Sequence, residues 1–247
     1  LTLNNKDNTW AIDAHGAVSN VMYPVATEDG AFTSELGYKY FLGLVKTSGA
    51  WQGGVSRRVL SKRWDSNDLG INFQNNFAAN RAFVVYQQFN PKGIFNYAST
   101  DISVEYNYNL QTGKPTGVGL NAFSFLQFRN FWNAFIGMEI APVDIYDYFE
   151  PRVDGRVFLR TKIANLFLGI NTNNNKKISS GFDLYMGSTG VISPTQPRNP
   201  WIGGGIRLSW RASDRFNTTA IFNVNTDWGD RGWVNQEEDG TIVFGRR

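Results

Sequence analysis

The chain has 247 residues, of which 15% are aromatic and 18% charged, and its formal net charge at pH 7 is +3. It contains no cysteine and a single histidine, which excludes a disulfide framework, a thiolate metal site, a cysteine nucleophile and a His-rich metal site. No stretch reaches the ~18 consecutive apolar residues of a membrane-spanning helix, and the lysines and arginines form no basic run that indicates a nucleic-acid partner.

Apolar residues recur with a period of two along the chain, which predicts strands with one apolar and one polar face. In Asp101–Asn109, for example, Ile102, Val104, Tyr106 and Tyr108 alternate with polar residues. The predicted strands in chain order are Trp10–Ser19, Tyr38–Leu44, Trp51–Leu60, Arg81–Phe89, Asp101–Asn109, Gly117–Phe128, Trp132–Ile140, Val157–Asn171, Lys177–Met186, Ile202–Arg211, Phe216–Asp227 and a partial strand at Thr241–Gly245. No linker or helical stripe stands out, so we expect one all-β domain over residues 1–247.

The connections between these strands alternate between short and long. Short turns are expected near residues 47–50, 129–130, 172–176 and 212–214, and the longer connections are Val21–Glu35, Ser61–Asn80, Pro142–Arg156, Gly187–Pro200 and Trp228–Gly240. Short periplasmic turns and long external loops are typical of an antiparallel transmembrane β-barrel. On this pattern Leu1 lies on the periplasmic side.

The alternative is a soluble sandwich or lipocalin-like barrel, in which the apolar face points inward. Two features favour the membrane barrel. The predicted lumen-facing residues are ionisable and carry both signs: Asp13, His15, Lys39, Asp101, Glu105, Glu139, Asp183, Arg207 and Arg211. The predicted membrane-interface aromatics lie near the ends of apolar ladders: Trp10, Tyr38, Trp51, Tyr108, Trp132, Trp201 and Trp210.

Four short stretches carry a resemblance to a known family: Gly37–Tyr40 running to Lys46–Gly49, Asn67–Gly70, Tyr148–Arg152 and Thr241–Arg247. They are similar to the barrel of an outer-membrane β-barrel family of Bacteroidota, domain of unknown function family 5916. The resemblance implies that a module similar to family 9 carbohydrate-binding domains precedes the barrel, and that any glycan contact of that module lies outside this chain. It also implies a signal peptide and further strands beyond these residues, so we expect the barrel to be truncated at both ends. The family supplies no activity.

The one histidine is the only candidate catalytic base. His15 is close in sequence to Asp13, which allows a Ser/His hydrolase with Ser19 or a serine of another strand as the nucleophile. No nucleophile elbow or other local motif supports this, so an imidazole in a lumenal hydrogen-bond network is the preferred interpretation, and we predict no enzyme.

Two loops carry oxygen-rich clusters of the kind that Ca²⁺ requires. The candidate ligands are Asp65, Asn67 and Asp68 in one loop, and Asp144, Asp147, Glu150 and Asp154 in the other. Neither cluster has EF-hand spacing, and Arg63, Arg152 and Arg156 stand nearby, so pairing of the carboxylates with arginine is preferred over a metal. We predict no cofactor.

Three functions remain open. The preferred one is a non-enzymatic anchor or subunit of an outer-membrane assembly, because Phe41, Phe83, Phe123 and Phe135 alternate onto the polar face and would fill the lumen. A channel or uptake component for glycans or small solutes is the alternative, and an outer-membrane hydrolase is the third. The expected partners are outer-membrane lipid, lipopolysaccharide and neighbouring proteins; glycans could also stack on the loop aromatics Trp64, Tyr146, Tyr148, Trp228 and Trp233.

Overall fold

The computed structural model describes residues 1–24, 32–65, 74–153, 155–189, 199–226 and 231–246. These residues form strands and connections only, so the all-β class predicted from the period-two pattern is confirmed. The described part of the chain contains no helix long and apolar enough to cross a membrane.

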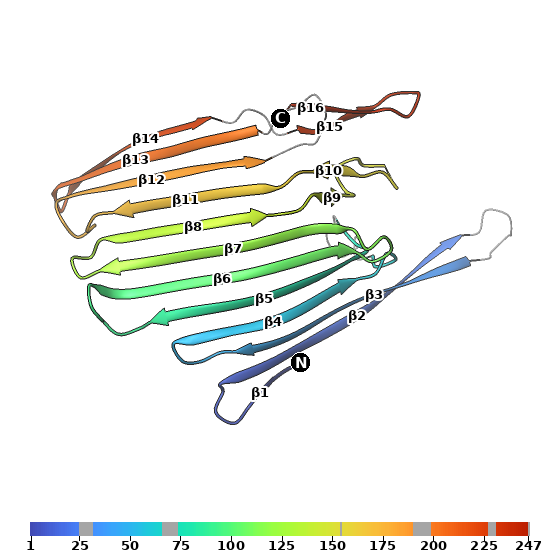
Figure 1. Ribbon diagram of the computed structural model, residues 1–247, viewed down its shortest axis with the longest axis horizontal. Coiled ribbons are helices and arrows are strands. Elements are labelled where there is room, and N and C mark those ends of the chain that lie inside the picture. Colours follow the sequence, from blue (N-terminus) through green and yellow to red (C-terminus); the bar gives the residue numbers. More distant parts are fainter. Residues whose placement is uncertain (25–31, 66–73, 154, 190–198, 227–230, 247) are drawn as a thin grey trace.

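One antiparallel sheet of twelve strands makes up most of the molecule (Figure 1). Its order is β1-β2-β3-β4-β5-β6-β7-β8-β11-β12-β13-β14. Each strand therefore pairs with the strands before and after it in the chain, except that β9 and β10 stand between β8 and β11. The strands are β1 (Thr2–Asn4), β2 (Trp10–Pro24), β3 (Phe32–Lys46), β4 (Trp51–Leu60), β5 (Phe77–Gln88), β6 (Phe95–Asn109), β7 (Pro115–Phe128), β8 (Asn133–Ala141), β11 (Ile163–Asn171), β12 (Ile178–Thr189), β13 (Asn199–Ser213) and β14 (Phe216–Thr226).

The register keeps apolar residues opposite one another across the whole sheet. One row of cross-strand partners runs Val84, Ile102, Ala122, Met138, Leu166, Met186 and Ile202. Because side chains in a strand alternate between faces, this register collects the apolar half of every strand on one face and the polar half on the other. We call these the apolar face and the polar face.

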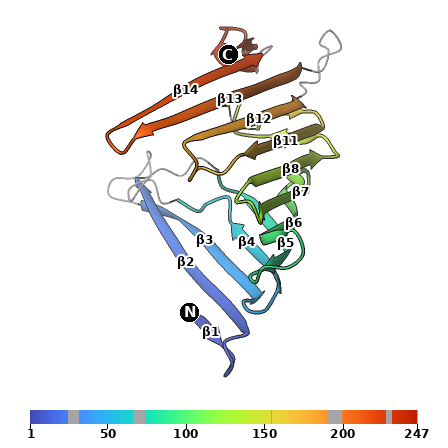
Figure 2. The same ribbon diagram turned by 90° about the vertical axis from the view of Figure 1, so that its left-hand side faces the viewer.

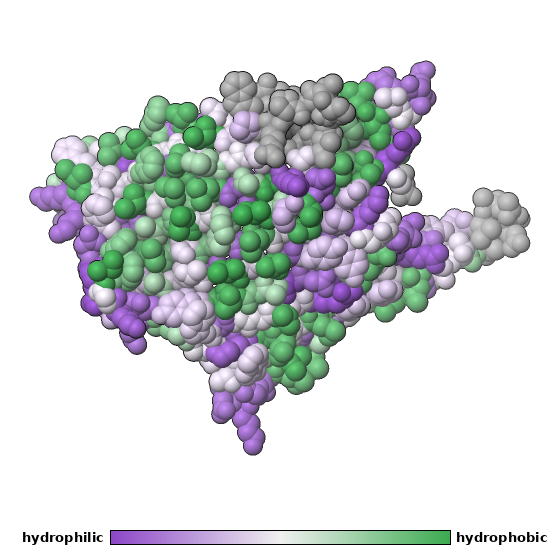
Figure 3. All heavy atoms as spheres, viewed as in Figure 1, coloured by the Kyte–Doolittle hydropathy of each residue, from purple (hydrophilic) through white to green (hydrophobic). Residues whose placement is uncertain are grey.

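The sheet is strongly curved, and Figure 2 shows it end-on as an open arc. The apolar face is its convex side: Figure 3 shows hydrophobic side chains gathered over the strands on that side, with hydrophilic residues at both ends. The outer edges of β1 and β14 have no partner strand among the described residues. The described strands do not close into a barrel, so the transmembrane barrel expected from the sequence stays a prediction.

Two short hairpins lie at the end of the sheet that carries the long connections, which we call the loop end (Figure 1). They are β9 (Ile145–Asp147) with β10 (Phe158–Arg160), and β15 (Arg231–Gln236) with β16 (Ile242–Arg246). The hairpins contact each other through the Phe158 and Phe244 rings, whose centroids are 4.5 Å apart. The opposite end, with the short connections, we call the turn end.

Most strand predictions are confirmed, and the errors lie at the loop end. Trp51–Leu60 is β4 as predicted. The single strand predicted over Val157–Asn171 is wrong, because it breaks after Arg160 into β10 and β11. The expected loops Pro142–Arg156 and Trp228–Gly240 contain β9 and β15, whose pairing partners are other short segments rather than the sheet.

Candidate functional site

The polar face is the first candidate site, because it gathers nearly all the charge of the sheet. The register places every predicted lumen-facing residue on it: Asp13, His15, Lys39, Asp101, Glu105, Glu139, Asp183, Arg207 and Arg211. Among the charged residues of the twelve strands, Lys46 and Arg57 are the only two on the apolar face. The sequence pattern thus predicted the face of these side chains correctly.

Several charged side chains on the polar face have partners of opposite charge or complementary polarity on neighbouring strands. Arg81 Nε lies 3.6 Å from Glu105 Oε1. Asn165 donates to Glu139 Oε2 at 3.1 Å, and Arg207 Nη2 donates to an oxygen of Asn171 at 2.6 Å. These contacts join neighbouring strands, so the charges tie the wall together rather than converging on one reactive point.

Aromatic rings cover much of the remaining polar face. Phe123 lies 6.4 Å from Phe135 and 6.0 Å from Phe167 between ring centroids. Gly137 lies beneath the Phe167 ring, which occupies the space that a Cβ at residue 137 would need. The concave surface around these strands is therefore occupied by side chains.

The structure places the His15 ring against an aromatic neighbour. Its ring stacks on Phe41 at 5.1 Å between centroids, and it has no hydrogen bond within the described ranges of the chain. Ser19, the proposed nucleophile, instead accepts a hydrogen bond from the Asp65 backbone N–H at 3.1 Å. The hydrogen-bond network expected for His15 is likewise not seen there, because aromatic stacking takes its place.

A segment that the sequence did not reveal folds over the polar face at the loop end. We call Ser61–Asp65 the inward segment. Trp64 is only 6% exposed, and Lys39 Nζ lies 4.6 Å from the centre of its ring. Gly37 permits the approach, because a Cβ there would overlap the backbone of Arg63 and Trp64. A glycine within a polar strand face was the one signal for this contact.

Two carboxylates of the second acidic loop cluster form ion pairs with one arginine. Arg160 Nε lies 3.0 Å from Asp147 Oδ2, and Arg160 Nη2 lies 3.5 Å from Glu150 Oε2. Charge pairing was preferred over Ca²⁺, but the predicted partners Arg152 and Arg156 were wrong: Arg152 lies over the Trp233 ring, and the hairpin β9–β10 brings Arg160 to the carboxylates instead.

Within the described residues, no group of three or more histidine, cysteine, aspartate or glutamate side chains is placed to hold a metal ion. Asn67, Asp68 and Asp154 lie outside them. Of the nearby arginines, Arg63 Nε lies 3.9 Å from Glu35 Oε1.

The predicted interface aromatics lie in two bands, with one exception. Trp10, Trp51, Trp132 and Trp210 are exposed near the turn end, and Tyr38 and Tyr108 lie on the apolar face toward the loop end. The placement of Trp201 with this group is wrong. It precedes the outward Ile202 by one residue, so it points to the polar face, where its ring takes the space left by Gly187.

The loop aromatics proposed for glycan stacking contact residues of the chain itself. Trp64 packs under Lys39, Lys114 Nζ lies 4.5 Å from the Tyr146 ring centre, and the Tyr148 hydroxyl is 2.9 Å from that of Thr112. Trp228 lies outside the described residues. A polar pocket of about 320 Å³ lies beside Tyr148, but its Asn109 already accepts hydrogen bonds from Gln111 and Thr112. Trp64, Tyr146 and Tyr148 therefore help to shape the loops, and glycan stacking stays a prediction.

Comparison with known proteins identifies the family and nothing more specific. The sequence model of the family described as Domain of unknown function (DUF5916) matches residues 1–247, so the chain belongs to this family. No curated protein matches the chain, and neither does any solved structure.

Proposed function

We propose that this member of the family forms part of the wall of an outer-membrane β-barrel. In this proposal it acts as a non-enzymatic anchor or subunit of an outer-membrane assembly. The observation that carries the proposal is the exposed apolar face. Large side chains in the middle of the sheet, such as Ile136 and Ile206, are half exposed although they belong to well-paired strands.

The size of this face argues against a soluble protein. Twelve strands spaced about 4.8 Å apart span roughly 50 Å. Along β2 the apolar side chains run from Trp10 to Val18, which is about 26 Å of strand, close to the ~25 Å apolar band of a membrane barrel. A surface of this size far exceeds the few hundred Å² of contiguous apolar surface that soluble monomers expose.

In the proposed assembly the two outer edges of the sheet pair with further strands. Lipid supplies no hydrogen bonds, so an unpaired strand edge in the hydrocarbon region is strongly unfavourable. Further strands of a longer chain, or strands of another copy, would satisfy the edges of β1 and β14.

The polar face supports an anchor in preference to an open channel. The Phe123–Phe135–Phe167 cluster and the inward segment both lie where a pore would run. We expect the protein to show low conductance in planar bilayers. A large, stable single-channel conductance would overturn the anchor and favour the channel.

Membrane insertion itself is tested with single cysteines, since the natural sequence has none. Spin labels at Ile206→Cys and Arg207→Cys occupy adjacent positions on opposite faces of β13. In vesicles the first label should be accessible mainly to dissolved oxygen and the second mainly to a polar nickel complex. Equal access of the nickel complex to both positions would exclude a lipid-facing apolar face.

A further inference from the structure

Among the charged residues of the twelve described strands, one lies on the apolar face away from its ends. Lys46, at the end of β3, directs its Nζ into the adjacent turn, where it donates to the Ser48 carbonyl at 2.6 Å. Arg57 lies well inside β4, opposite Leu42 on one side and Asn80 on the other. A charge placed among lipid-facing side chains is costly unless it is paired or reaches the interface.

Arg57 is held by neutral acceptors. Its Nε donates to the Tyr40 hydroxyl at 3.3 Å, Nη1 to Asn80 Oδ1 at 2.8 Å and Nη2 to the Tyr108 hydroxyl at 3.0 Å. Asn80 is oriented in turn by donating to the Tyr106 carbonyl at 2.9 Å. The guanidinium is therefore fixed in place.

The contacts of Arg57 leave both its charge and two of its donors unmatched. No described carboxylate lies within ion-pair distance of it. A guanidinium has five N–H donors, so one N–H on each terminal nitrogen stays available. Each of these remaining N–H groups can donate to an oxygen of a phosphate group.

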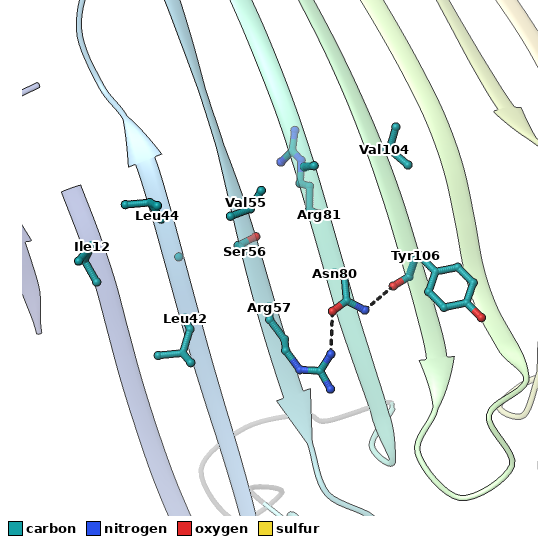
Figure 4. A pocket seen from close by; sticks show the side chains of 12 residues that line it. Ile12, Leu42, Leu44, Val55, Ser56, Arg57, Asn80, Arg81, Val104 and Tyr106 are labelled. Atoms are coloured by element: carbon teal, nitrogen blue, oxygen red, sulfur yellow. Dashed lines mark hydrogen bonds between the residues drawn. The ribbon is translucent and has the colours of Figure 1, made fainter. Parts of the chain in front are cut away.

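An apolar groove begins at this guanidinium and runs toward the turn end. Its volume is about 690 Å³, and its lining includes Leu42, Leu44, Val55 and Val104, with Arg57 and Tyr106 at the loop-end side (Figure 4). Ala82 leaves room along its course, because its side chain is small and lies opposite Val55. A second groove of about 500 Å³ shares Leu44, Val55, Ala82 and Val104 and extends the track to Trp10.

We propose that Arg57 and this groove form a binding site for an acyl lipid whose phosphate headgroup has a net negative charge, with the headgroup phosphate on the free Arg57 donors and an acyl chain along Leu44 and Val55. The proposal rests on the membrane location proposed above. The distance supports it: from Arg57 to Gly53 the groove follows four residues of β4, about 13 Å, and half of a hydrocarbon core is about 15 Å. The tyrosine hydroxyls flank the headgroup position, as is common at membrane interfaces.

The test measures which lipid contacts the groove. A fluorophore at Leu120→Cys reports on the neighbouring strand, because Leu120 is the cross-strand partner of Val104. A fluorophore at Ile206→Cys on β13 serves as a distant control on the same face. The protein is reconstituted in phosphatidylcholine vesicles doped with doxyl-labelled phosphatidylglycerol or doxyl-labelled phosphatidylcholine, and quenching is compared.

At Leu120 we expect phosphatidylglycerol to be preferred about fivefold, the factor that one arginine near an anionic lipid supplies, and at Ile206 we expect no preference. Arg57→Gln should abolish the preference. Arg58→Gln should retain the preference, because this substitution removes an equal charge from the neighbouring position, which lies on the polar face. The double variant Tyr40→Phe, Tyr108→Phe keeps every charge but releases two of the three contacts that orient Arg57, and should weaken the preference.

A preference that stays at the wild-type level in Arg57→Gln or in the double tyrosine variant overturns the proposal, as does an equal loss in Arg58→Gln. Absence of quenching by either lipid at both probes would instead contradict the membrane location itself, so the two failures are distinguishable.

Discussion

On the convex side of β13, Ile202, Ile206 and Leu208 are each about half exposed, whereas on the concave side of the same strand Arg207 is hydrogen-bonded to Asn171 across β12. In a soluble one-sheet layer the relation is reversed, because apolar side chains form the buried contacts and charges face water. Here the polar side makes the specific cross-strand contacts. In the function proposed above, the apolar side packs against lipid, and the first three predictions below test one side against the other.

The largest effect is expected from a charge in the middle of the apolar face. Ile136→Lys places a cation opposite Ser124 and Leu168, and should cost about 2–4 kcal/mol of folding free energy in a bilayer. Urea unfolding in phosphatidylcholine vesicles measures this. Asn121→Lys, opposite Glu139 on the polar face, is the control and should be nearly neutral. Equal destabilisation by both variants would remove the distinction between the faces.

A smaller effect is expected where the polar face is packed. Gly137→Ala forces the Phe167 ring away from the sheet and should cost about 1–3 kcal/mol, as overpacking does. The double variant with Phe167→Leu should recover part of this cost, because the smaller side chain leaves room for the new methyl group. Strictly additive losses in the same unfolding assay would show that the ring does not cover residue 137.

A substitution that displaces the inward segment should change the conductance and have a smaller effect on the free energy of unfolding. Gly37→Ala should displace Arg63 and Trp64 from the polar face and raise the small conductance measured in planar bilayers. Gly16→Ala is a suitable control, because a Cβ there lies 3.4 Å from its nearest neighbour on the apolar side of β2. Unchanged conductance in Gly37→Ala would show that the segment does not obstruct the concave side.

The smallest effect lies outside both faces, in the exposed turn between β15 and β16. The Thr241 backbone N–H donates to Asp239 Oδ1 at 2.9 Å, and with the Thr241 hydroxyl it lowers the pKa of this carboxyl. A lowered folded-state pKa contributes stability that is present above the unfolded pKa of about 3.9 and lost as pH falls through the folded value.

The Thr241 amide chemical shift should therefore titrate below the ordinary aspartate midpoint, and Asp239→Asn should abolish that titration. Resistance of the sheet itself to acid should not change in this variant. A Thr241 midpoint at the ordinary value would show that the turn contact is absent in solution.

Some site residues could be predicted from the sequence and others could not. The face of Glu105 or Arg207 follows from alternation alone, since each side chain's direction depends only on its position in the strand. The pairing of Glu150 with Arg160 does not, because it depends on a hairpin formed by two three-residue strands that carry almost no periodic signal. Trp201 was misplaced because a ring near a strand end shifts face with a one-residue error in the pattern.

By itself, the sequence determined the all-β class, the approximate strands and the division into an apolar and a polar half, because these depend on the local period of two. Only the tertiary structure decided the continuous register, the curvature that turns the apolar half outward, the open edges and the inward segment. It also decided that Tyr40, Asn80 and Tyr108 surround Arg57. These features join residues far apart in the chain, and the contacts depend on how each strand aligns with the next, which no local pattern specifies.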